Sequence, residues 1–216
     1  MSLLDDFEGC SGLEKRSKVL LMTEYISKRI SLCDTKCVKL ALENEAISNR
    51  GGLCVEPDRP CFTAALVLAH RKIGRTLVLC RTKEESLLWT SKFMALANHI
   101  QVTDCILKTG QVGVTICHLN KVNPICDRFD QYDRVVLNQF DTFPNVDFIY
   151  KIGGTKTLKW GLSSFPWLCK PKILRKVADW IGLVDISCED VVTHFTIGTR
   201  IEAKDGIWSH KILIIY

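Results

Sequence analysis

The sequence predicts an α/β domain in which a mostly parallel sheet is covered by helices on both faces. Short runs that are apolar throughout, such as residues 76–80 and 134–137, are typical of strands buried on both sides. Between these runs lie segments whose apolar residues recur at helical spacing. The alternation favours a parallel sheet, and a content of 47% hydrophobic and 25% charged residues is typical of a folded domain.

The first fifty residues predict a helical lead-in. Apolar residues recur at helical spacing over residues 14–31, with Lys and Arg between them, and a second helix is expected over residues 36–47. The run at residues 49–52, which contains two glycines, ends that helix. Residues 56–60 are expected to form a loop because they hold two prolines, and an apolar, Ala- and Leu-rich helix follows over residues 62–70.

The rest of the chain predicts the sheet and its covering helices. Strands are expected at 76–80, 101–107, 112–118, 134–137, 158–162 and 210–216, and helices at 83–98 and 171–183. Thr82 is placed to cap the first of these helices. No linker or repeat divides the sequence, so we expect one domain over residues 1–216, with residues 1–50 as the lead-in and residues 51–216 as the α/β core.

The N-terminus and the cysteines predict an intracellular protein, nuclear or cytoplasmic. The first residues are acidic before they are basic, and they lack the apolar stretch of a secretory signal. No segment reaches the roughly 18 unbroken apolar residues of a membrane span. The eleven cysteines are scattered, and many lie in apolar runs, which indicates mostly free thiols in a reducing compartment.

Four segments share their order and spacing with the motifs of one enzyme family. They are Arg50-Gly51-Gly52-Leu53-Cys54-Val55-Glu56 followed by Cys61-Phe62-Thr63, residues 75–80 followed by Trp89 and Phe93, residues 132–137 followed by Asn138-Gln139-Phe140-Asp141, and residues 159–166. Together they resemble the first RecA-like lobe of the Swi/Snf-type ATPases of helicase superfamily two. The resemblance covers about residues 15–210 and implies a RecA-like (P-loop NTPase-like) three-layer sandwich.

The segment that resembles the phosphate loop departs from the chemistry of a working loop. Such a loop wraps phosphates with backbone N–H groups, reaches them with a Lys and holds Mg²⁺ with a Ser or Thr hydroxyl. Of these chemical groups only the hydroxyl of Thr63 remains here. Phe62 stands at the position of the Lys, and two prolines remove backbone N–H donors. Arg59 is the one residue placed to compensate for the missing Lys.

The segment that resembles the acidic motif departs as well. The family uses an Asp to hold the metal and a Glu to orient the attacking water, and here these positions are Asn138 and Gln139. An amide is a poor Mg²⁺ ligand beside a carboxylate, and Asp141, at the family's His position, does not restore the pattern. The sequence also ends where the second lobe, which supplies an arginine finger, would begin. We therefore expect no ATP hydrolysis, no translocation and no catalytic residue.

A basic block follows these motifs. Its members carry seven positive charges without an Asp or Glu between residues 151 and 176: Lys151, Lys156, Lys159, Lys170, Lys172, Arg175 and Lys176. Basic residues interleaved with aromatic ones, here Trp160, Phe165 and Trp167, can bind single-stranded nucleic acid through phosphate contacts and stacking. A solvated face is the alternative, and Trp160 is expected in the core because it lies in a predicted strand.

The cysteine spacing raises a zinc site as an alternative. Cys33 and Cys37 are spaced within the loose range of zinc ligands, and Cys54 with Cys61 could complete a four-thiolate site. No second tight pair exists, so buried thiols are expected instead. The sequence therefore predicts no metal and no cofactor.

The predicted function is a catalytically inactive, helicase-like lobe that acts as a binding or scaffold module for protein or nucleic acid. The degenerate nucleotide site that the resemblance implies comprises Gly51, Gly52, Arg59, Thr63, Asn138 and Gln139. One alternative is a nucleotide-binding lobe completed by a partner chain. Another is a structural component of a larger assembly, for which a viral assembly is one option. Such a component would associate through the apolar C-terminal strand at residues 210–216.

Overall fold

The computed structural model describes residues 6–28, 30, 35–48, 51–55, 59–70, 74–105, 107–108, 111–121, 131–163, 169–183 and 196–197. Its helices are α1 (Gly12–Ser27), α2 (Thr35–Ser48), α3 (Arg59–Ala69), α4 (Lys83–Leu96) and α5 (Pro171–Ile181). Its strands are β1 (Gly52–Val55), β2 (Arg75–Cys80), β3 (Val102–Thr103), β4 (Gly113–His118), β5 (Arg134–Asn138), β6 (Leu158–Ser163) and β7 (Thr196–Ile197). No helix in these ranges is long and apolar enough to cross a membrane.

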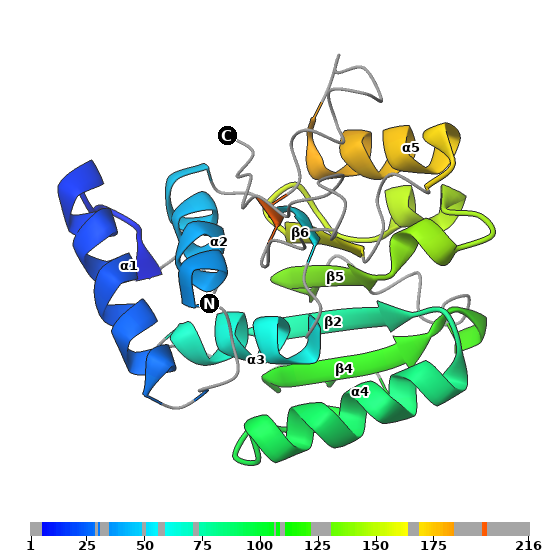
Figure 1. The fold of residues 1–216 in the computed structure, drawn as a ribbon, viewed down its shortest axis with the longest axis horizontal. Helices are drawn as coiled ribbons and strands as arrows, with labels where there is room; N and C mark the ends of the chain where they lie inside the picture. Colours follow the sequence, from blue (N-terminus) through cyan, green and yellow to red (C-terminus); the bar gives the residue numbers. More distant parts are fainter. Residues whose placement is uncertain are drawn as a thin grey trace, which may run out of the picture.

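The strands form one sheet in the order β3-β4-β2-β5-β6-β1-β7, and every pair in it is parallel (Figure 1). Parallel strands require crossover connections, and helices α3, α4 and α5 lie in those that follow β1, β2 and β6. Strand β6 separates β1 from β5, so the two segments that resemble the phosphate loop and the acidic motif leave the sheet on either side of one strand. The predicted α/β fold, a parallel sheet with helices on both faces, is confirmed.

The sheet divides the core into two layers. Along β2, Val78 and Cys80 contribute to the core formed with α1, α2, α3 and α4, whereas Leu77 and Leu79 contribute to the core formed with α5 and the short 3₁₀ segments after β5. This alternation follows from the two-residue period of a strand, since both faces are covered. In Figure 1, α1, α2 and α3 lie together at one side, α4 lies along β4, and α5 lies above β6.

Most predicted elements are confirmed, with shifts of a few residues at their ends. The strand predicted at 101–107 is wrong beyond Val102–Thr103, because the backbone N–H of Cys105 bonds to Oγ1 of Thr103 (3.1 Å) in a turn that ends the pairing. The loop predicted at 56–60 is wrong at its end, since α3 begins at Arg59 and accepts Pro60 in its first turn. Strand β1 was not predicted, because its four residues are too few for a period. The strand predicted at 210–216 lies outside the described residues.

A buried ion network joins the helical lead-in to the sheet. Glu45 of α2 accepts hydrogen bonds from Nε and Nη2 of Arg134 (2.9 and 2.6 Å), from Nε1 of Trp160 (2.9 Å) and from Nε2 of His70 (2.9 Å). His70 bonds through Nδ1 to Asp6 (2.9 Å). The side chains of Glu45, His70 and Arg134 are inaccessible to solvent. Residues before α1, on α2 and at the start of β5 and β6 therefore meet through charge rather than through apolar packing alone.

Candidate functional site

The candidate site lies at the edge of the sheet where β1, β5 and β6 end. The strands are parallel, and register pairs Val55 with Ser163 and Asn138 with Leu162, so these ends are level with one another. The N-terminus of α3 and the N-terminus of α4 come to the same edge, because each helix follows a strand that ends there. In open α/β sheets the crevice at this edge is where ligands bind.

Two amides and a carboxylate form the centre of the site. Asn138, the last residue of β5, is buried and donates from Nδ2 to Oε1 of Glu85 (2.5 Å). Gln139, with its amide oriented to suit its neighbours, donates from Nε2 to the same Oε1 (3.0 Å). The other oxygen of Glu85 accepts from the backbone N–H of Arg81 (2.8 Å). Glu85 is thus the shared acceptor of both amides.

Gln139 also accepts a hydrogen bond from Arg59, which belongs to the segment that resembles a phosphate loop. Its amide oxygen accepts from Nη2 of Arg59 (2.7 Å), so Arg59, Gln139, Glu85 and Asn138 form one continuous hydrogen-bonded chain across the edge of the sheet. The backbone of Gln139 is left-handed (φ 50°, ψ 47°), which is uncommon for a residue with a side chain. This conformation turns the chain sharply after β5 into the 3₁₀ segment Phe140–Thr142.

Three further polar groups surround this chain. Thr63 is buried, and its hydroxyl has no hydrogen-bond partner in the described part of the protein. Burial raises the pKa of Asp141 above its usual value, although a hydrogen bond with Ser163 and the charge of Arg59 oppose the shift. Burial, with the nearby charge of Glu85, raises the pKa of the Cys80 thiol, which therefore stays neutral and is a poor nucleophile.

An open cleft of about 480 Å³ adjoins the hydrogen-bonded chain. Its walls come from the start of α3, from α4 and from the turn after β5: Arg59, Pro60, Arg81, Thr82, Glu84, Glu85, Leu88, Trp89, Lys92, Gln139 and Thr142. Its charged residues are of both signs, with three basic (Arg59, Arg81, Lys92) and two acidic (Glu84, Glu85). The cleft is therefore not a uniformly basic pocket of the kind that polyphosphate favours.

The structure does not bring the two glycines of the predicted nucleotide site to this edge. Gly51 and Gly52 precede or begin β1, and Gly52 is level with Trp160 rather than with Ser163. At about 3.3 Å per residue, that places Gly52 about 10 Å from the end of the strand. Gly51 is required by packing instead, because a Cβ there would lie 1.8 Å from the carbonyl oxygen of Lys159. Of the predicted set, Arg59, Thr63, Asn138 and Gln139 lie at the site.

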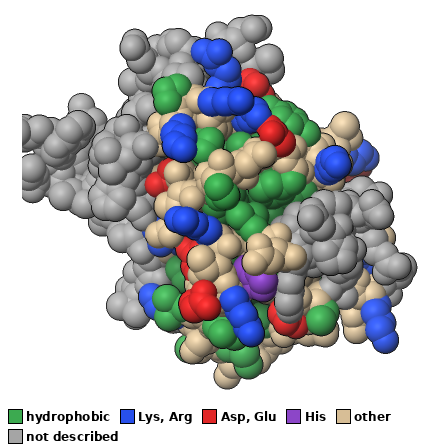
Figure 2. Space-filling model, turned by 90° about the vertical axis from the view of Figure 1, so that its right-hand side faces the viewer, with side chains coloured by type: hydrophobic (Ala, Val, Ile, Leu, Met, Phe, Trp, Pro, Cys, Tyr) green, Lys and Arg blue, Asp and Glu red, His purple; other side chains and the backbone are tan. Residues whose placement is uncertain are grey.

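The basic block is spread over more than one element, and some of its members are already engaged. Lys159 lies at the start of β6, half-buried, with Nζ 5.6 Å from the ring centre of Trp180 near the end of α5. Lys170 caps the opposite end of α5, about 15 Å away along a helix of that length. Lys176 forms an ion pair with Asp147. On the face drawn in Figure 2, Lys and Arg side chains are interspersed with acidic and hydrophobic ones.

The cysteines of the zinc alternative are only partly assembled. Sγ of Cys37 lies 3.6 Å from Sγ of Cys54, and Cys61 is buried nearby in sequence at the start of α3. Cys33 lies outside the described residues. Within the described part of the chain, no group of three or more His, Cys, Asp or Glu side chains is arranged to hold a metal ion.

Glu85 is the site residue that sequence reasoning missed. In the sequence it is one of two acids in the first turn of a predicted helix, a position that the helix dipole explains. Its contact with residues 138 and 139 spans more than fifty positions of the chain. A signal was present all the same: amides at the two positions expected to be acidic leave room for a carboxylate from elsewhere.

Comparisons with known proteins return structures but no sequence relatives. No protein-family model and no curated protein matches this chain. The Hef helicase domain of Pyrococcus furiosus is 15% identical over 66% of this chain and 36% of that chain, with a TM-score of 0.45. A hypothetical ATP-dependent RNA helicase from Sulfolobus tokodaii is 15% identical over 81% of this chain and 56% of that chain, with a TM-score of 0.46. The chain thus spans less than two thirds of either protein.

Proposed function

We propose that this chain is a helicase-like lobe that does not hydrolyse ATP and acts as a scaffold that binds another protein. The observation that carries the proposal is the hydrogen-bonded chain from Arg59 through Gln139 and Glu85 to Asn138. The finer assignment, to a degenerate Swi/Snf-type lobe, rests on the four sequence segments and stays a prediction.

The position of Glu85 argues against a lost but recoverable catalytic pair. Its Oε1 lies 2.5 Å from the Asn138 amide nitrogen and 3.0 Å from that of Gln139. With Asp and Glu at these positions, three carboxylates would share one half-buried corner, and like charges at such distances strongly disfavour ionisation. The amides and Glu85 therefore suit one another, whereas Glu85 and an acidic metal site would not.

Arg59, the residue expected to compensate for the missing Lys, contacts Gln139 instead. Arg59 donates to Gln139, so a bound phosphate would compete with an existing charge-assisted network that includes Glu85. The negative charge of Glu85 would also repel a phosphate. Both effects support a site that holds the fold together at this edge rather than one that binds Mg-ATP.

Exposed apolar side chains support the choice of a protein as the ligand. Leu87, Leu88 and Met94 of α4 are more than half exposed, at 60%, 56% and 53%. Two members of the basic block are already engaged, by contrast, since Lys159 is half-buried over Trp180 and Lys176 is paired with Asp147, which weakens the case for a nucleic-acid track. We therefore place protein binding before nucleic-acid binding.

A nucleotide-binding lobe completed by a partner chain is the second candidate. It is favoured by two buried oxygens, Oγ1 of Thr63 and Oδ1 of Asn138, which have no hydrogen-bond partner among the residues described. Such atoms cost free energy unless something satisfies them.

Two measurements separate the two candidates: the melting temperature with and without Mg-ATP, and the rate of ATP turnover. The scaffold proposal expects no shift and no turnover, because a ligand that binds the native state stabilises it by mass action. A shift that Thr63→Ala abolishes would favour the nucleotide-binding lobe and overturn the proposal.

The double variant Asn138→Asp/Gln139→Glu tests the role of Glu85. We expect it to melt at a lower temperature and to gain no turnover, because it places three carboxylates together. Asn98→Asp/Gln101→Glu makes the same chemical change at two exposed positions and is the matched control. Turnover in the first variant, without loss of stability, would contradict the proposal.

A further inference from the structure

Helix α1 exposes apolar side chains on the side that it does not use for packing. Val19, Thr23 and Ile26 are buried against the rest of the protein. Leu13 and Leu20, by contrast, are 78% and 49% exposed. A surface helix of a single globular domain usually has one apolar face, so a second one indicates a further contact.

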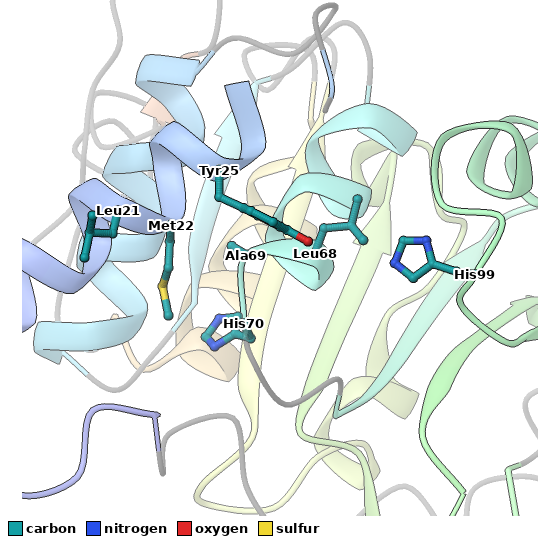
Figure 3. A pocket seen from close by; sticks show the side chains of 7 residues that line it. All are labelled: Leu21, Met22, Tyr25, Leu68, Ala69, His70 and His99. Atoms are coloured by element: carbon teal, nitrogen blue, oxygen red, sulfur yellow. The ribbon is translucent and has the colours of Figure 1, made fainter. Parts of the chain in front are cut away.

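The exposed apolar surface continues into a pocket beside the helix. Leu21 and Tyr25 of α1 border it, and Leu68 of α3 and His99 face them from the other side (Figure 3). The volume of the pocket is about 400 Å³. Tyr25 reaches across toward Leu68, so α1 and the end of α3 form facing walls of this pocket.

The side of α1 that carries Leu13 and Leu20, called the Leu20 stripe below, also carries two charged residues. They are placed symmetrically about Leu20. Arg16 and Glu24 are each four residues from Leu20, so all three lie on one side of the helix. Both charged side chains are exposed, and neither has an ion-pair partner among the residues that the structure describes. They are about 12 Å apart along the helix axis, which is too far for them to pair with each other.

We propose that α1 is a self-association surface that pairs antiparallel with α1 of a second copy of this chain. A two-fold axis at Leu20 would bring Arg16 of each copy opposite Glu24 of the other and Leu20 against Leu20. A surface that pairs in this way must be complementary to itself, and a leucine flanked at equal distances by opposite charges has that property. Ser17 and Ser27 are both exposed on the Leu20 stripe, and their small side chains allow the two helices to approach each other closely.

The association is expected to be weak and sensitive to salt. One pair of sixteen-residue helices covers less than the roughly 1,000 Å² that stable interfaces bury, and its ion pairs are exposed to solvent. The proposal is independent of whether the lobe hydrolyses ATP, because α1 and the sheet edge with Glu85 are separate surfaces.

Sedimentation velocity of the full chain over a range of concentrations tests the proposal. We expect a concentration-dependent dimer that Leu20→Lys weakens at least about tenfold, as loss of a central contact does. Val112→Lys, the same type of change at a half-exposed apolar position just before β4, is the matched control and should leave the dimer intact. Melting temperatures should stay close to that of the parent, since both side chains are half-exposed.

A charge swap gives the sharper test. Arg16→Glu and Glu24→Arg should each weaken the dimer, because each places like charges opposite one another, and the double variant should restore it. A monomer at every concentration would overturn the proposal and leave the α1 face to another occupant. Equal loss in the single and double variants, or a dimer that no α1 variant affects, would overturn it as well.

Discussion

Replacing Glu45 by Ala should remove a large part of the stability of this fold. The carboxylate is fully buried and accepts four hydrogen bonds, two of them from the guanidinium of Arg134. The substitution leaves that guanidinium buried without its counter-ion. It also leaves the indole N–H of Trp160 and Nε2 of His70 without an acceptor, although Nδ1 of His70 keeps its bond to Asp6.

The expected loss is about 3–5 kcal/mol, the usual cost of removing one partner of a buried ion pair. In a chain of this size, each kcal/mol corresponds to roughly 2–4 °C in melting temperature, so the melting point should fall by about 6–20 °C. Glu45→Gln should cost nearly as much, because an amide NH₂ group would face the donors of Arg134 and His70 in place of an acceptor.

Urea denaturation followed by circular dichroism measures the free energy of unfolding. Glu43→Ala is the matched control on the same helix, since Glu43 meets Lys39 at 3.9 Å on the surface and should cost at most about 0.5 kcal/mol. A loss below about 1 kcal/mol in Glu45→Ala, with an unchanged denaturant slope, would refute the reasoning.

Three further predictions test other contacts. Gly51→Ala should destabilise the protein by about 1–3 kcal/mol or more, because its Cβ would overlap the Lys159 carbonyl. Thermal melting measures this loss, and Gly12→Ala is the control: its Cβ would meet nothing within 4 Å, so the change should be neutral or stabilising. Burial alone would lower the pKa of His70, but its hydrogen bonds to Asp6 and Glu45 raise the pKa above 6.5. The stability that protonated His70 contributes is therefore present below pH 6.5 and is lost as the pH rises through the raised pKa. His70→Gln should flatten the fall of melting temperature over that rise in pH. Thr82→Ala removes the oxygen that accepts from the Glu85 backbone (3.2 Å) and should cost about 1 kcal/mol in urea denaturation; an unchanged midpoint would show that the cap contributes nothing.

The pKa of Glu45 adds an acid limb to the same experiment. Burial raises it, but the charge of Arg134 and the hydrogen bonds from His70 and Arg134 outweigh burial and lower it to about 2. Because the pKa is depressed on folding, this contribution is present above pH 4.5 and is lost as the pH falls toward 2. The wild type should therefore lose stability over this range, and Glu45→Gln should lose less.

Strands and helices with a strong period could be predicted because their patterns are local. The apolar runs at β2 and β5 match strands buried on both faces. The face of α5 that carries Ile173, Val177 and Trp180 is buried as its spacing predicts. Strand β1 and the early end of β3 could not be predicted in this way, since four residues and a single Thr hydroxyl contact leave no periodic signal.

The candidate site was predicted in part, and all six of its predicted residues came from the resemblance. Asn138 and Gln139 follow a predicted strand and Thr63 begins a predicted helix, and parallel strands bring such positions to one edge. Arg59 reaches the same edge although it was expected in a loop. Gly51 and Gly52 do not, because the register of β1 against β6 places Gly52 three residues back from the edge. The basic block is continuous in sequence, yet Lys159 and Lys170 lie at opposite ends of α5, a separation that the sequence does not reveal.

By itself, the sequence determined the alternation of strands and helices and the presence of amides at positions 138 and 139, because both depend only on which residues stand at which positions. The tertiary structure alone decided what these amides contact. Glu85 meets Asn138 and Gln139, and Glu45 meets Arg134, across 53 and 89 positions of the chain. A charge is tolerated in the interior only where a partner is brought to it, and folding, rather than spacing along the chain, brings these partners together.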